Sequence, residues 1–123
     1  IIGNAFGFSA FVLRELFPSA SFDIIDAEIE GPDSQVASGA FRDIVVAQGF
    51  DMQLTTGFSP ADTERALRHS AYDLVFIDGD HTNTQVYLDF YGVHRFLAPH
   101  CLVALHDVVF AHLEEAAQRI LER

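Results

Sequence analysis

Apolar residues along the chain follow two spacings, one typical of buried strands and one typical of helices. Short runs of β-forming residues alternate with longer stretches in which apolar side chains recur every three or four positions. Glycine, proline, aspartate and serine, which favour turns and helix ends, separate them. Strands are predicted at residues 1–2, 22–25, 52–55, 72–77 and 102–105, and helices at 10–17, 36–48, 59 to about 69, 82–96 and 111–121.

This regular alternation predicts an α/β domain with a doubly wound, mostly parallel sheet covered by helices on both faces. Right-handed crossovers and a reversal beside the first strand predict the spatial strand order 3-2-1-4-5. The chain of 123 residues has no repeat or linker, so one domain spanning residues 1–123 is expected.

The stretch from Tyr72 to His81 is the most informative part of the chain. An apolar run predicts a strand buried on both faces, and it ends in Asp78-Gly79-Asp80-His81. Thr82, with Gln85 three residues later, predicts a capping box at the start of a helix. Ligands bind at the carboxyl ends of strands in such sheets, although Asp78 and Asp80 forming only a turn and a cap is the alternative.

A second candidate binding segment is the loop from Gly3 to Ser9. Gly3 and Gly7 allow a tight turn and close approach to a ligand, and the following helix offers free N–H groups to an anionic group. A simple turn with an N-cap is about equally compatible. Asp26, roughly 20 residues further on, can bind both hydroxyls of a ribose. The departure from Gly-x-Gly-x-x-Gly disfavours a dinucleotide.

The composition limits which classes of binding partner and which cellular compartment are compatible with the sequence. The net charge is −11, with seven arginines and no lysine, which disfavours nucleic acid as a partner. No apolar run is long enough for a membrane span. The single Cys101 excludes an internal disulfide and is typical of a reducing, cytoplasmic setting. The chain opens on Ile1 without a methionine, so a fragment of a longer protein is expected.

These segments together resemble a known family. Gly3-Asn4-Ala5-Phe6-Gly7-Phe8-Ser9, Asp26, Gly57-Phe58-Ser59, residues 72–81 and Leu105-His106-Asp107 resemble the class I S-adenosylmethionine-dependent methyltransferases, which have a Rossmann-like fold. The nearest likeness is to the bacterial branch near catechol-type O-methyltransferases and cephalosporin-hydroxylase-like proteins. The resemblance covers nearly the whole chain.

The resemblance implies a binding mode for S-adenosylmethionine. The glycine loop would hold the methionine moiety, Asp26 the ribose hydroxyls, and Gly57 to Ser59 would lie near the adenine. The expected cofactor-binding residues are Gly3, Asn4, Ala5, Phe6, Gly7, Ser9, Asp26, Ala27, Gly57, Phe58, Ser59, Asp78, Gly79, Asp80 and His81.

Two departures from the family qualify this expectation. Ile1 stands where these families usually have an acidic residue. The last two strands of the usual core are also expected to be missing. An open sheet edge of that kind invites pairing with another chain, such as a second copy.

Metal and proton-transfer roles follow from the same resemblance. In catechol-type relatives, carboxylates after the fourth and fifth strands hold a divalent cation, and Asp78 and Asp107 match them, with His106 beside them. The cation would be Mg²⁺ or another divalent ion. His81 matches a basic catalytic residue and can act as general base, with Asp78 beside it. The alternatives are a surface histidine and a capping aspartate.

The predicted function is methyl transfer from S-adenosylmethionine to a small-molecule acceptor, most readily at oxygen. Two rival classes stay open, an NAD(P)-binding oxidoreductase and a non-catalytic nucleotide-binding or assembly module. The missing middle glycine disfavours the oxidoreductase, because a pyrophosphate needs close approach of the backbone.

Overall fold

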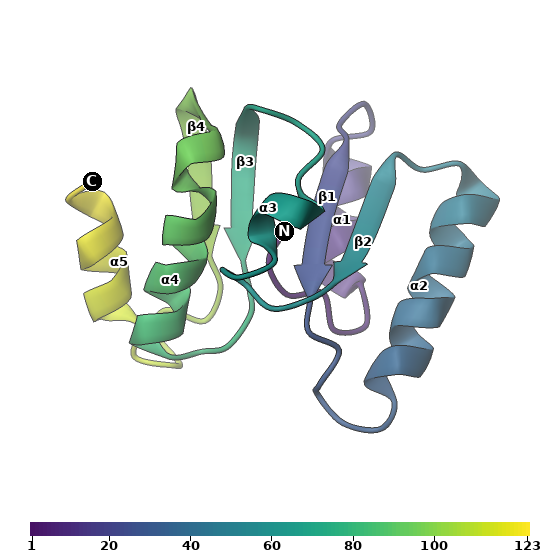
Figure 1. The fold of residues 1–123 in the computed structure, drawn as a ribbon, viewed down its shortest axis with the longest axis horizontal. Coiled ribbons are helices and arrows are strands. Elements are labelled where there is room, and N and C mark those ends of the chain that lie inside the picture. The colour runs from purple at the N-terminus through teal and green to yellow at the C-terminus, as the bar shows by residue number, and fades with distance from the viewer.

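The computed structural model describes residues 1–123 and shows a parallel sheet between two layers of helices (Figure 1). No helix combines the length and apolar character that a membrane span requires. The elements are α1 (Phe8–Leu16), β1 (Phe22–Asp26), α2 (Ser34–Gln48), β2 (Met52–Thr56), α3 (Thr63–Ala66), β3 (Tyr72–Ile77), α4 (Asn83–Val93), the 3₁₀ helix η1 (His94–Phe96), β4 (Leu97–Leu105) and α5 (Glu114–Leu121).

The sheet consists of two parallel strand pairs joined by the first residues of the chain. β1 pairs with β2, and β3 pairs with β4. Ile2 lies between the two pairs and forms parallel bridges to Ile25 of β1 and Ile77 of β3. The spatial order is therefore β2-β1-Ile2-β3-β4, which confirms the predicted order 3-2-1-4-5.

Two hydrophobic cores lie on opposite faces of the sheet, because successive side chains of a strand point to opposite sides. Ile24 of β1 packs in the core that α1 and α2 cover, through residues such as Phe41. Its neighbour Ile25 packs on the other face with Ile77 and the apolar side of α4, including Phe90. Helices therefore cover both faces of the sheet, as the sequence predicts.

Glycine and threonine set the helix ends where the sequence predicts. Gly49 ends α2 in the left-handed conformation, with φ 64°. Thr82 caps α4, since its hydroxyl accepts a hydrogen bond from the Gln85 backbone N–H at 3.2 Å. The predicted return bond of the Gln85 side chain does not form, so the second half of the capping box is wrong.

The predicted helix from Ser59 to about His69 is also wrong, because only the four residues of α3 are helical. Ser59 does not cap it, and its hydroxyl instead accepts a hydrogen bond from the Thr63 hydroxyl at 3.2 Å. Leu67 is extended, and the Arg68 backbone N–H donates to Asp23 at 2.8 Å. Tertiary bonds thus replace the last turns of the expected helix.

Two boundaries near the end of the chain differ from the prediction. α5 begins at Glu114 and not at residue 111, because His112 has a positive φ of 55° that no right-handed helix contains. β4 begins at Leu97, ahead of the predicted residue 102, and its register against β3 is irregular between Tyr72 and Leu74.

β3 is fully buried on one face only, which corrects the prediction that both faces are buried. Val75 and Ile77 pack in the core under α4 and α5. Phe76, which points to the other face, is only half-buried. Phe76, Leu74 and the exposed Leu102 line a groove on that face, of about 620 Å³.

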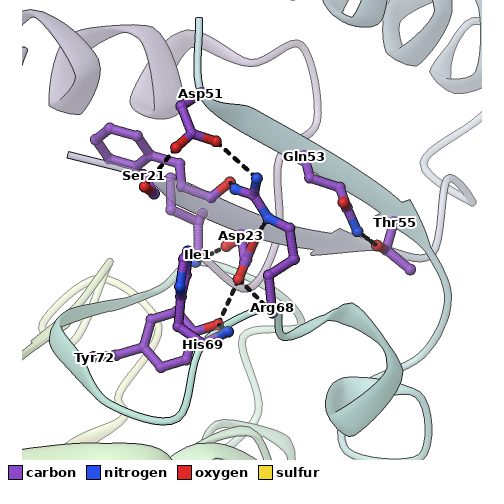
Figure 2. A network of polar contacts seen from close by, with 10 residues as sticks. Ile1, Ser21, Asp23, Asp51, Gln53, Thr55, Arg68, His69 and Tyr72 are labelled. Carbon is purple, nitrogen blue, oxygen red and sulfur yellow. Dashed lines mark hydrogen bonds and ion pairs between the residues drawn. The ribbon is translucent and has the colours of Figure 1, made fainter. Parts of the chain in front are cut away.

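A polar network connects the amino-terminal ends of β1, β2 and β3 (Figure 2). Asp23 of β1 is buried and accepts hydrogen bonds from the Arg68 side chain and the Tyr72 hydroxyl. Arg68 also donates to Asp51 at 2.7 Å. Burial alone would raise the pKa of Asp23, but the bonds from Tyr72 and Arg68 outweigh it and lower that pKa. Burial and the bond to Asp23 raise the pKa of Tyr72 to about 12.

Candidate active site

A cavity of about 490 Å³ lies where Ile2, β1 and β3 reach their carboxyl ends. This volume is within the range of small-molecule pockets, roughly 300–1,000 Å³. Its position matches the point where the strand order reverses, the usual ligand position in open α/β sheets. The lining residues are Ile2, Gly3, Ile25, Asp26, Ala27, Ile29, Glu30, Gly57, Phe58, Ser59, Gly79, Asp80, His81, Gln85 and Asp89.

Most of the predicted cofactor residues meet at this cavity. Segments from four separate parts of the sequence supply them, as expected for strand ends that share one edge. The predicted residues that line it are Gly3, Asp26, Ala27, Gly57, Phe58, Ser59, Gly79, Asp80 and His81. Those that do not line it are Asn4, Ala5, Phe6, Gly7, Ser9 and Asp78.

Gly3 lets the first loop cross β3 at close range. A Cβ atom at this position would lie 2.0 Å from the carbonyl oxygen of Asp78, and the φ of Gly3 is +87°. Both the space and the backbone conformation therefore require glycine. The loop and the end of β3 consequently form one continuous wall of the cavity.

The Asp26 carboxylate holds the glycine loop in place. Its Oδ2 accepts hydrogen bonds from the backbone N–H groups of Asn4 at 2.6 Å and Ala5 at 3.0 Å. Its Oδ1 accepts one from the Glu28 backbone at 2.6 Å. A carboxylate offers about four acceptor positions, so these three bonds leave roughly one for a ligand.

The remainder of the glycine loop contributes an unpaired polar group and exposed aromatic rings. The Asn4 side chain is buried, and neither its nitrogen nor its oxygen has a hydrogen-bond partner in the protein. Buried amides without partners are rare, so a polar ligand group is a natural partner for it. Phe6 and Phe8 are exposed, whereas Gly7 starts α1 with φ 82°.

Gln85 and Asp89, both on α4, line the cavity and were not among the predicted site residues. Gln85 Nε2 donates to the Ser59 carbonyl at 2.8 Å and to Asp89 Oδ1 at 2.7 Å. Asp89 is 1% exposed. Burial raises the pKa of Asp89 to about 6, against the opposing hydrogen bonds from Ser59 and Gln85. The sequence offered a signal for Asp89, because this acidic residue stands among the apolar helix positions Val86, Phe90 and Val93.

The cavity lining is acidic and contains no arginine. Asp26, Glu30, Asp80 and Asp89 all contribute to it. Glu30, in the loop between β1 and α2, therefore lies at the site. Two exposed apolar side chains, Ile29 and Phe58, complete its walls. Such a lining favours a cationic or neutral ligand with a flat apolar part over a phosphate-bearing one.

The predicted metal ligands come together beside the cavity. His106 Nδ1 lies 2.9 Å from Asp78 Oδ1 and 3.3 Å from Asp107 Oδ2. His81 Nε2 joins them, 3.5 Å from Asp78 Oδ1 and 4.0 Å from Asp107 Oδ2. One ligand atom from each of Asp78, His81 and His106 fits within 4.8 Å of the others. Ser9 reaches the same carboxylate, with its hydroxyl 3.4 Å from Asp78 Oδ2.

Comparison with known proteins adds one positive finding. A family model described as a methyltransferase domain matches residues 1–108. Neither the curated proteins nor the solved structures gave a match. The matched residues include all the strands and every residue that lines the cavity.

Proposed function

The chain belongs to the class I S-adenosylmethionine-dependent methyltransferase family, and from this premise we propose that it methylates a small-molecule acceptor at oxygen. The acidic cavity at the reversal of strand order is the observation that carries the proposal. It has no cationic side chain to hold a pyrophosphate, and four carboxylates would repel one. This disfavours the NAD(P)-dependent oxidoreductase considered above.

The cavity residues fit the parts of the cofactor. Asp26 retains an acceptor position for a ribose hydroxyl. The buried Asn4 amide does not line the cavity but follows Gly3, which does, in the loop expected to hold the methionine end. Ile29 and Phe58 can flank a planar base. Bound S-adenosylmethionine supplies a methyl group on a positively charged sulfur, which the carboxylates of the lining favour electrostatically.

His81 is the proposed general base. It lines the cavity, and its side chain is 40% exposed, so an acceptor hydroxyl can reach it. Histidine exchanges protons near neutral pH, which suits removal of a proton from a hydroxyl. Asp78 and Asp107 lie 3.5 and 4.0 Å from its Nε2, so two carboxylates are in place to orient the ring.

Asp78, His106 and Asp107 also suit a divalent cation, with His81 left to act as the base. One imidazole with two carboxylates can hold transition metals such as Mn²⁺, Fe²⁺ or Zn²⁺, whereas Mg²⁺ prefers oxygen ligands and water. A cation bound there would orient an acceptor oxygen and stabilise its negative charge. The protein residues then fix the place of the acceptor relative to the methyl group.

Cofactor binding is tested by calorimetry with S-adenosylhomocysteine and with NADH. We expect the wild-type protein to bind S-adenosylhomocysteine and not NADH. Asp26→Ala should weaken this binding by about 1–3 kcal/mol, because a charged hydrogen bond to the ligand is lost and the loop loosens. Binding of NADH alone would support the oxidoreductase, and binding of neither ligand would support the assembly module.

The cation is tested by methyl-transfer assays in excess chelator. We expect the chelator to abolish turnover and Mn²⁺ to restore it better than Mg²⁺, because the donor set contains nitrogen. His106→Ala should lose turnover while its affinity for S-adenosylhomocysteine stays unchanged, since His106 does not line the cavity. Full turnover in excess chelator would rule out the cation and leave His81 as the sole candidate for proton removal.

A further inference from the structure

The side chain of Gln85 is held in one orientation by two acceptors. Both neighbours of its Nε2, the Ser59 carbonyl at 2.8 Å and Asp89 Oδ1 at 2.7 Å, accept hydrogen bonds. The two hydrogens of the amide are therefore used, and a flipped amide would place its oxygen against two other oxygens. Gln85 Oε1 has no hydrogen-bond partner in the protein and is the polar atom of this side chain left for a ligand.

The neighbouring groups of this wall also present acceptors. The Ser59 carbonyl and the Asp89 carboxylate both face the Gln85 amide, and the Ser59 hydroxyl accepts a hydrogen bond from the Thr63 hydroxyl at 3.2 Å. The two amide hydrogens of Gln85 are thus directed away from a ligand, and its oxygen is left for one. This oxygen requires a ligand edge that carries hydrogens.

We infer that Gln85, oriented by Asp89, reads the 6-amino group of the cofactor's adenine and rejects purines with a 6-oxo group. This inference rests on the proposed function. An adenine amino group brings two hydrogens to the acceptor wall, whereas hypoxanthine and guanine would place a carbonyl oxygen against Gln85 Oε1. Asp89 is a positioning residue, because it acts through Gln85 and is 1% exposed.

The test compares S-adenosylhomocysteine with S-inosylhomocysteine, which has an oxo group in place of the 6-amino group and a hydrogen on the neighbouring N1. Calorimetry on the full chain should show that the wild-type protein prefers the adenine compound by at least about tenfold. Gln85→Leu should bring the two affinities close to each other, mainly by weakening the adenine compound. Asp89→Asn should reduce the preference in part, because an amide in place of the carboxylate no longer dictates which way the Gln85 amide faces.

Gln118→Leu is the matched control, since Gln118 is exposed on α5 and contacts only Glu122, at 3.4 Å. It should keep the wild-type preference. Circular dichroism and unfolding midpoints show whether each variant is folded. Equal binding of both compounds by the wild-type protein, or a full preference in Gln85→Leu, would overturn the inference and leave the proposed function intact. Binding of neither compound would remove both.

Discussion

Burial of Asp89 makes protein stability depend on pH. The folded pKa of about 6 lies above the ordinary value of 3.8, so the folded state binds a proton more tightly than the unfolded state. The contribution of protonated Asp89 to the free energy of unfolding is therefore fully present below pH 3.8, and it is lost as the pH rises through about 6. A shift of this size corresponds to about 3 kcal/mol.

Asp89→Asn should remove this dependence, because the amide stays neutral and has similar shape. Urea unfolding between pH 4 and pH 7 measures it, as the difference in unfolding free energy between the two proteins. We expect the wild-type protein to lose about 2–3 kcal/mol relative to the variant over this range. Parallel curves would show that the pKa of Asp89 is the same in the folded and unfolded proteins and would contradict the prediction.

At the scale of elements, the segment after α3 is fixed to β1 by a buried ion pair. The side chain of Asp23 is 1% exposed and that of Arg68 is 32% exposed. Arg68→Ala would leave a buried carboxylate without its cation, which usually costs about 3–5 kcal/mol. Urea unfolding at neutral pH measures the loss.

Arg95→Ala is the comparison for Arg68→Ala. Arg95 pairs with Glu64 at 2.6 Å, but both side chains are largely exposed. This exposed pair should contribute less than about 1 kcal/mol, because water and salt screen it. Equal losses in the two variants would contradict the idea that burial gives the Asp23 pair its importance.

At the scale of the whole molecule, patterns within single elements were predictable. The alternation that sends Ile24 and Ile25 to opposite cores, the left-handed Gly49 that ends α2, and the polar residues after each strand all follow from local chemistry. Because parallel strands share one edge for their carboxyl ends, the meeting of Gly3, Asp26 and Asp80 was predictable as well.

Features decided by distant partners were not predictable. Gln85 is three residues after a capping threonine, yet its amide bonds to the carbonyl of Ser59, 26 residues away. Ser59 precedes a proline as an N-cap would, yet its hydroxyl accepts a hydrogen bond from the Thr63 hydroxyl. In each case the local motif offered one hydrogen bond, and a buried tertiary network offered better-shielded ones. The α4 wall of the cavity was missed for this reason.

The acidic lining of the cavity also has a consequence for release of the product. S-adenosylmethionine carries a positive sulfur, whereas S-adenosylhomocysteine has lost that charge. Attraction by Asp26, Glu30, Asp80 and Asp89 therefore acts on the substrate form and disappears once the methyl group has left. Methyl transfer would therefore remove part of the electrostatic binding energy, and S-adenosylhomocysteine would dissociate more readily.

This effect should be visible as a response to ionic strength. Between about 0.01 and 1 M salt, the Debye length falls from about 30 to 3 Å. The affinity for S-adenosylmethionine should decline over this range more than the affinity for S-adenosylhomocysteine, as measured by calorimetry. Asp80→Asn, which removes one exposed carboxylate, should flatten the difference. If the ratio of the two affinities does not change with salt, electrostatic attraction does not contribute to the release of S-adenosylhomocysteine.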